Sequence, residues 1–173
     1  EAKNLLAAYG IDVPAQCWIS SAADLDTLDA SWLDQPVAMK VVSKDILHKS
    51  DAGGVKLNLQ GRDTLRAAYA DIMASCRAYQ ADADIAGVLL TPMVPKGVEV
   101  IIGVSRDPIF GPVMMFGLGG IFVEILEDIA FRSIPLSRQD AESMVNQIKA
   151  RKILEGARGA AGVSKEALVA LIL

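Results

Sequence analysis

The stretch PVAMKVVSKDILHKSDAGGVKLNL, residues 36–59, places two short apolar runs on either side of a polar loop. In residues 36–42 and again in residues 55–59, apolar side chains alternate with their neighbours, and a period of two predicts β-strands. The loop between them, residues 43–54, ends in a glycine pair, which is typical of a turn with special backbone geometry. The residues expected on one face of each strand are Val37, Met39, Val41, Val55, Leu57 and Leu59.

Helices and further strands flank this stretch. Residues 64–79 carry Leu65, Tyr69, Ile72, Cys76 and Tyr79 at spacings of three and four, which predicts an amphipathic helix. Strands and helices alternate irregularly and include a hairpin, so we predict an α+β fold with mixed or antiparallel sheets. The other strands are expected over residues 17–19, 86–91, 98–104, 113–116, 121–125 and 131–134. The other helices are expected over residues 2–9, 24–30, 138–150 and after residue 164, the last three with the N-caps Ser21, Ser137 and Ser164.

Composition and charge exclude several classes of protein. Of the 173 residues, 52% are hydrophobic and 22% are charged, which predicts a globular chain rather than a disordered one. The net charge of −4 argues against a nucleic-acid-binding face, and no apolar run reaches the roughly 18 residues of a membrane span. With two distant cysteines and one histidine a zinc site is implausible, and a cytoplasmic setting is the default expectation.

The middle and the end of the chain suggest its organisation. Two prolines punctuate residues 92–97, which we interpret as a hinge between two lobes, residues 1–93 and residues 94–173. The chain stops inside the apolar run of residues 167–173, which would leave an apolar helix exposed. We therefore expect a fragment of a longer polypeptide.

Lys40 and His48 are the leading candidates for chemistry. A lysine in the middle of an apolar strand is costly to bury unless it meets an anion, so Lys40 is a candidate phosphate ligand, with a solvent-facing position as the alternative. His48 is the sole imidazole and lies on the polar loop, where Ser50 or Asp51 could orient its second nitrogen. Unprotonated imidazole can attack phosphorus at neutral pH, and the alternative, which the residues alone favour, is an exposed loop histidine without a role.

Two glycine-rich segments and several acidic residues extend the set of candidates. Gly53 and Gly54 would let backbone N–H groups approach phosphate oxygens, and residues 117–120 follow a strand and could cradle a nucleotide. A tight turn is the alternative for residues 117–120. Magnesium bound to phosphates needs one or two carboxylates, and an arginine can pair with a phosphate. The residues considered for these roles are Glu99, Glu124, Glu127, Asp128 and Arg132.

The order of these motifs resembles the ATP-grasp unit of ADP-forming acyl-CoA synthetases, which are acid–CoA ligases. The resemblance covers nearly the whole chain. It implies an ATP-grasp fold, truncated at the C-terminus, in which two α+β lobes flank a cleft for ATP or ADP. It also implies the reaction acyl-CoA + ADP + phosphate ⇌ acid + CoA + ATP. The segments that carry it are residues 36–43, 45–55, 97–104, 106–108, 110–112, 116–121, 123–124, 128, 131–132, 154–156 and 158–159.

The resemblance also implies roles for single residues. His48 matches the histidine that receives the phosphoryl group and passes it to ADP, and Lys40 matches the phosphate-binding lysine. Mg²⁺ would accompany the nucleotide, but the strand that supplies its ligands in the family lies beyond Leu173. Candidate metal ligands within this chain are Glu124 and Asp128. Other nucleotide-binding positions match Gly53, Gly54 and Val55 of the loop, Thr91, Met93 and Val94 of the hinge, and Glu99 near the ribose and phosphates.

Partner domains follow from the same resemblance. The CoA-binding and acid-activating domains are expected elsewhere in the polypeptide or in a partner subunit. A second interpretation is a regulatory ATP-grasp module of a multidomain protein lysine acetyltransferase. A third is a plain nucleotide-binding or interaction domain in which His48 has no role.

Overall fold

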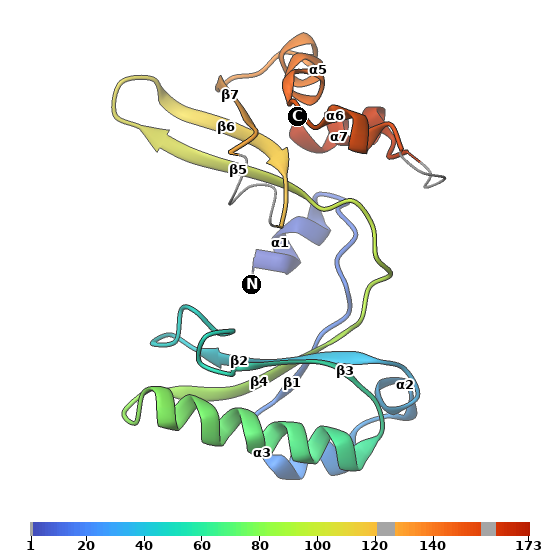
Figure 1. Cartoon of the computed structure of the whole chain (residues 1–173), viewed down its shortest axis with the longest axis vertical. Helices are drawn as coiled ribbons and strands as arrows, with labels where there is room; N and C mark the ends of the chain where they lie inside the picture. The colour runs from blue at the N-terminus through green and yellow to red at the C-terminus, as the bar shows by residue number, and fades with distance from the viewer. Residues whose placement is uncertain (1, 121–126, 157–161) are drawn as a thin grey trace. The chain divides into compact units, whose positions relative to one another are not determined.

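The computed structural model describes residues 2–120, 127–156 and 162–173, which form two units, Glu1–Pro95 and Lys96–Leu173 (Figure 1). Each unit has its own sheet and its own apolar core. Every strand pair within the described ranges is antiparallel. The predicted α+β class is therefore confirmed.

Unit 1 is built on a four-stranded sheet with the order β1–β4–β2–β3, and helix α3 lies along one face (Figure 1). The predicted strands over residues 17–19 and 55–59 are confirmed at both ends. The strands are β1 (Cys17–Ile19), β2 (Val37–Ser43), β3 (Val55–Leu59) and β4 (Ile85–Pro92). The helices are α1 (Ala2–Ala8), the 3₁₀ helix η1 (Ala22–Thr27), α2 (Ala30–Leu33) and α3 (Arg62–Tyr79).

Helix α3 buries the apolar stripe that its sequence predicts. Leu65, Ile72 and Cys76 are fully buried, and Tyr69 packs partly against the same core. The prediction for Tyr79 is wrong, because this side chain is 55% exposed. Tyr79 is the last residue of the helix, so no further turn continues the stripe into the core.

Strand β3 contains a local irregularity that alternation does not predict. Asn58 has φ 56, and the register with β2 shifts, so that Leu59 faces Val37 while Val55 faces Lys40. Such an extra residue moves every later side chain to the other face. Leu59 is therefore buried and Leu57 is 53% exposed, so the predicted common face is wrong. Val55 instead shares the helix-free face of the sheet with Lys40.

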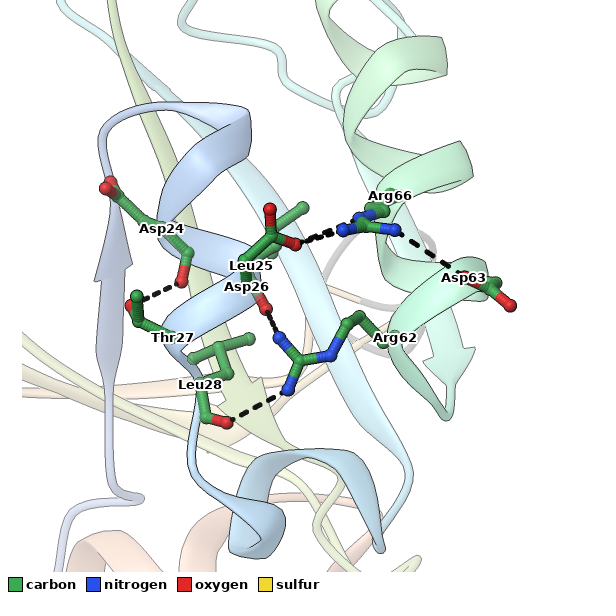
Figure 2. A network of polar contacts seen from close by, with 8 residues as sticks. All are labelled: Asp24, Leu25, Asp26, Thr27, Leu28, Arg62, Asp63 and Arg66. Carbon is green, nitrogen blue, oxygen red and sulfur yellow. Dashed lines mark hydrogen bonds and ion pairs between the residues drawn. The ribbon is translucent and has the colours of Figure 1, made fainter.

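Two arginines of α3 hold the segment that precedes β2 (Figure 2). Arg62 donates to the backbone oxygen of Leu25 at 2.6 Å and to that of Leu28 at 3.4 Å. Arg66 pairs with the carboxylate of Asp26. These contacts join η1 to α3 across a long separation in sequence.

The helix expected over residues 24–30 is instead the 3₁₀ helix η1, and the predicted Ser21 is its N-cap. The Asp24 carboxylate accepts hydrogen bonds from the Ser20 hydroxyl at 2.7 Å and from the backbone N–H groups of Ser20 and Ser21. These hydrogen bonds, led by that of the Ser20 hydroxyl, lower the pKa of Asp24. The start of this segment therefore follows local capping rules.

Unit 2 is built on a three-stranded sheet with the order β5–β6–β7. The hairpin predicted between the first two strands is confirmed as antiparallel, whereas the strand expected over residues 121–125 lies outside the described residues. Across the described ranges, none of the helices has the length and apolar character needed to cross a membrane. The elements are β5 (Val100–Asp107), β6 (Gly111–Leu118), β7 (Ile129–Ser133), α5 (Arg138–Gln147), α6 (Arg151–Leu154) and α7 (Lys165–Ile172).

The predicted helix caps of unit 2 are confirmed. The Ser137 hydroxyl accepts from the backbone N–H of Asp140 at 3.2 Å, and the Ser164 hydroxyl accepts from that of Ala167 at 3.1 Å. Helix α5 ends three residues before the predicted Ala150. It ends early because Ile148 leaves the helical conformation and is buried.

Candidate functional site

An open pocket in unit 1 brings together three residues that the sequence analysis selected separately. Lys40 comes from β2, Val55 from β3 and His48 from the loop that joins these strands. Of the other five lining residues, the sequence analysis named Ser50 and Asp51 only as groups that could orient His48. It selected none of Leu47, Lys49 and Leu57 as site residues. The full lining is Lys40, Leu47, His48, Lys49, Ser50, Asp51, Val55 and Leu57.

Lys40 lies on the helix-free face of the sheet. Its strand neighbours Met39 and Val41 are buried against α3, whereas Lys40 is exposed and lies opposite Val55 and Leu89 on the adjacent strands. No carboxylate lies within ion-pair distance of Lys40 among the described residues. Its ammonium is thus available to an anion in the pocket.

The loop that carries His48 is anchored on both sides. Ile46 and Ala52 are buried in the core of unit 1, whereas Leu47 and His48 between them are exposed. The backbone N–H of Ala52 donates to the oxygen of His48 at 3.2 Å, and that of Gly54 donates to the oxygen of Lys49 at 2.7 Å. His48 therefore lies on a short exposed segment whose two ends, Ile46 and Ala52, are buried in the core of unit 1.

A second set of polar contacts holds the start of this loop. The Asp45 carboxylate accepts from the backbone N–H of Asp84 at 2.7 Å, and Lys44 pairs with the Asp84 carboxylate at 2.8 Å. The Lys44 ammonium lowers the pKa of Asp84. These contacts tie the loop to the segment that leads into β4.

The glycine pair serves the loop in a way that the sequence analysis did not anticipate. A Cβ on Gly54 would lie 2.4 Å from a methyl group of Val41, and a Cβ on Gly53, where φ is +65°, would lie 2.9 Å from Cβ of Ser75. The backbone N–H groups of both glycines already donate to oxygens within the turn. Packing against β2 and α3 is thus enough by itself to require glycine here.

The orienting role expected of Ser50 or Asp51 has no support in the geometry. Within the described part of the chain, no hydrogen bond joins the His48 ring to either side chain. Both residues nevertheless line the same pocket.

The three predicted hinge residues lie in different environments. Thr91 is buried and faces Ala38 of β2, and Met93 donates its backbone N–H to the oxygen of Pro36 at 2.9 Å. Val94 is 64% exposed. The backbone N–H of Met93 is thus already hydrogen-bonded to the residue that precedes β2.

Glu99 lies in unit 2, in a separate pocket beside the glycine-rich segment. The backbone N–H of Gly119 donates to the oxygen of Glu99 at 2.7 Å, and Gly120 has φ +60. This contact joins Glu99 to the glycine-rich segment, two features that the sequence analysis selected separately. The pocket is lined by Gly97, Val98, Glu99, Leu118, Gly119, Gly120 and Ile153.

The candidate metal ligands gain no support from the structure. Glu124 lies outside the described residues. Asp128 is buried, and its two carboxylate oxygens accept from the backbone N–H groups of Lys149 and Ala150, each at 2.7 Å. Asp128 therefore stabilises the chain after α5. Nowhere in the described ranges do three His, Cys, Asp or Glu side chains gather as a metal site.

Arg132 also has a local partner set. Its guanidinium donates to the Ser143 hydroxyl at 2.8 Å and to the Gln147 side-chain oxygen at 2.7 Å. These contacts join β7 to α5. The Arg132 guanidinium is thus held by partners within unit 2, and a role as a phosphate ligand gains no support.

These features define the class of protein. The model of the ATP-grasp domain family matches residues 1–173, and the chain belongs to this family. It is 48% identical over 173 residues to the acetate–CoA ligase [ADP-forming] I subunit beta of Pyrococcus furiosus, covering all of this chain and 74% of that subunit.

Two solved structures agree with this assignment. Acetyl-coenzyme A synthetase 1 of Ca. Korarchaeum cryptofilum, in complex with coenzyme A, Ca-AMPCP and HgCl+, matches 99% of this chain and 75% of its own, with a TM-score of 0.90 and 45% identity. The same synthetase with coenzyme A and Mg-AMPPCP, its phosphohistidine segment pointing towards the nucleotide binding site, matches 99% of this chain and 73% of its own, with a TM-score of 0.78 and 41% identity.

The particular branch follows from these relatives. The chain is the ATP-grasp component of an ADP-forming acid–CoA ligase of the acetyl-CoA synthetase type. Nothing in the comparisons favours the regulatory module of a lysine acetyltransferase.

Proposed function

We propose that His48 carries the phosphoryl group in this component and passes it to ADP. The proposal depends on one observation: His48 is exposed, lies on a loop that is held on both sides, and lines one pocket with Lys40. A relative with a phosphohistidine segment that points towards its nucleotide site supports it.

The chemistry requires two in-line transfers. An imidazole nitrogen of His48 attacks the phosphorus of a phosphohistidine in the acid-activating domain, so that a new N–P bond forms while the N–P bond of the donor histidine breaks and its imidazole leaves. A terminal oxygen of ADP then attacks the same phosphorus, and the N–P bond breaks as ATP forms. Lys40 contributes positive charge where the transferring phosphoryl oxygens become more negative.

Nucleotide binding is a property of the family, and its residues in this chain are proposals. We assign Lys40 and Val55 in unit 1 and Glu99 in unit 2 to the surroundings of the nucleotide, with Thr91, Met93 and Val94 beside the base. The structure gives Gly53 and Gly54 a packing role, so we retain them only as supports of the loop.

Mg²⁺ would neutralise charge on the nucleotide phosphates when bound. A relative binds Mg-AMPPCP, but the described residues of this chain contain no ligand cluster that fits the ion. We therefore derive no step through a metal here.

We further propose that the CoA-binding and acid-activating domains lie in another part of the polypeptide or in a partner subunit. The relative from Pyrococcus furiosus is a beta subunit, which supports a divided enzyme. A cytoplasmic setting is consistent with the free thiols of Cys17 and Cys76.

The test uses the full-length enzyme with [γ-³²P]ATP and Mg²⁺ in the absence of acceptor. Wild type should acquire base-stable, acid-labile phosphate, and His48→Asn should acquire none, because under this proposal the phosphoryl group of ATP enters the enzyme through His48. Ser50→Ala, which alters the same pocket without removing the imidazole, is the matched control. Equal labelling of wild type and His48→Asn would contradict the proposal.

A further inference from the structure

The pocket of unit 1 contains a second lysine that the relay described above does not use. Lys49 follows His48 directly and lines the same pocket, yet it is partly buried whereas His48 is exposed. Among the described residues, no carboxylate lies within ion-pair distance of Lys49, including Asp51 of the same pocket. A partly buried lysine without a counter-charge indicates a position for an anion.

The backbone of Lys49 is better fixed than its place on an exposed loop suggests. Its oxygen accepts from the backbone N–H of Gly54 at 2.7 Å, and the oxygen of Gly54 accepts from Val41 of β2, also at 2.7 Å. Two hydrogen bonds thus connect Lys49 to the strand that carries Lys40. The pocket therefore receives cations from two separate elements, the loop and β2.

The two lysines differ in their relation to the imidazole. Lys40 lies in the middle of β2, whereas Lys49 is joined to His48 by a single peptide bond and lines the same pocket. A phosphoryl group on His48 would bring about two negative charges and three strong acceptor oxygens next to Lys49. Charge-assisted hydrogen bonds to such oxygens are among the strong ones in proteins.

From this geometry we infer that Lys49 binds the phosphoryl group while His48 carries it, whereas Lys40 serves the nucleotide phosphates. This inference rests on the proposed function. Lys49 forms no covalent bond in either transfer. Its ammonium donates hydrogen bonds to the phosphoryl oxygens, which stabilises the N–P species against attack by water.

The experiment follows the stability of the labelled intermediate. Full-length enzyme is loaded from [γ-³²P]ATP and Mg²⁺, freed of nucleotide, and assayed for retained label over time at neutral pH. Lys49→Gln should lose label about ten- to a hundredfold faster than wild type, which corresponds to the loss of a charged hydrogen bond. Its affinity for ADP in calorimetry should be unchanged, and Lys49→Arg should restore retention.

Lys44→Gln provides the matched control, because it removes the same charge from the same loop at a residue that pairs with Asp84 outside the pocket. Unfolding curves check that each variant is folded, and Lys49→Met serves as a second variant.

Absence of label in wild type would reject the relay itself. Labelled wild type with normal retention in Lys49→Gln would reject only the role of Lys49. Equally rapid loss in Lys44→Gln, or weakened ADP binding in Lys49→Gln, would also overturn that role.

Discussion

Each unit contains a pair of adjacent glycines near a candidate site, and the two pairs differ in how closely they are packed. In unit 1, a Cβ on Gly54 would collide with Val41 at 2.4 Å. In unit 2, a Cβ on Gly120 would meet only the flexible carboxylate of Glu99 at 3.1 Å, and φ +60 is what favours glycine. Each pair thus contains one glycine with a positive φ, Gly53 or Gly120, but only in unit 1 does an added Cβ lie closer than 3.0 Å to a neighbouring atom.

The difference shows why a glycine pair is a poor indicator of a phosphate site. The backbone N–H groups of Gly53 and Gly54 are used within the loop, and it is the loop they support that presents His48. Gly119 and Gly120 border a pocket directly. Substitutions that separate packing, conformation and ligand binding test this comparison.

The largest effect is expected for Gly54→Ala. The new methyl group would press on Val41, on the backbone oxygen of Lys49 at 3.0 Å and on the Cys76 sulfur at 3.1 Å. Overpacking of this kind costs about 3 kcal/mol of unfolding free energy. Denaturant unfolding measures the loss, and labelling of His48 should fall as the loop shifts.

Gly97→Ala is the control for Gly54→Ala, because nothing lies within 4 Å of its added Cβ and its φ is not in the left-handed region. It should change stability by less than about 0.5 kcal/mol. Equal effects of the two substitutions would show that the close contacts of Gly54 do not determine its identity.

A smaller effect is expected for Gly120→Ala. An alanine at φ +60 costs about 1 kcal/mol of stability, and the methyl group would crowd Glu99 in its pocket. We therefore expect a modest stability loss with weaker ADP binding in calorimetry.

Gly111→Ala shares the positive φ but has open space around it, and it should reproduce only the stability loss. If ADP affinity were the same in both variants, the pocket beside Glu99 would not belong to the nucleotide site.

The smallest effects are expected for two aspartates beside helix starts, one in each unit. Because their hydrogen bonds depend on the local sequence, the two aspartates should behave alike. Asp24 and Asp140 accept hydrogen bonds from the serine hydroxyls of Ser20 and Ser137, and these bonds are the largest cause of the lowered pKa of each. A carboxylate whose pKa is lower in the folded state adds stability above its unfolded pKa of about 4, and this stability is lost as the pH falls through the folded value.

NMR titration should therefore give a pKa below the ordinary value for both carboxyls. Ser20→Ala and Ser137→Ala should each move the pKa of the nearby aspartate upwards and weaken the loss of stability in acid. A shift in one unit without the other would show that the surroundings of that helix contribute as well.

Local rules were enough to predict much of this chain. The periodicity of residues 64–79 identified α3, the serines identified three helix starts, and the alternation in residues 36–42 identified β2 with Lys40 opposite its apolar face. Each of these properties depends on residues within one or two turns of one another, so the sequence carries them directly.

Properties that depend on distant neighbours were not predictable in this way. Asn58 shifts the register of β3 and brings Leu57 to the pocket, Asp128 is committed to backbone N–H groups about twenty residues away, and Gly54 is glycine because of Val41. Motif order in the sequence identified the family and selected His48 as the residue proposed to carry the phosphoryl group. Only the packing of strands and helix shows which side chains are neighbours, because residues far apart along the chain can lie close together in space. The pocket that His48 shares with Lys40 and Lys49 is known in this way.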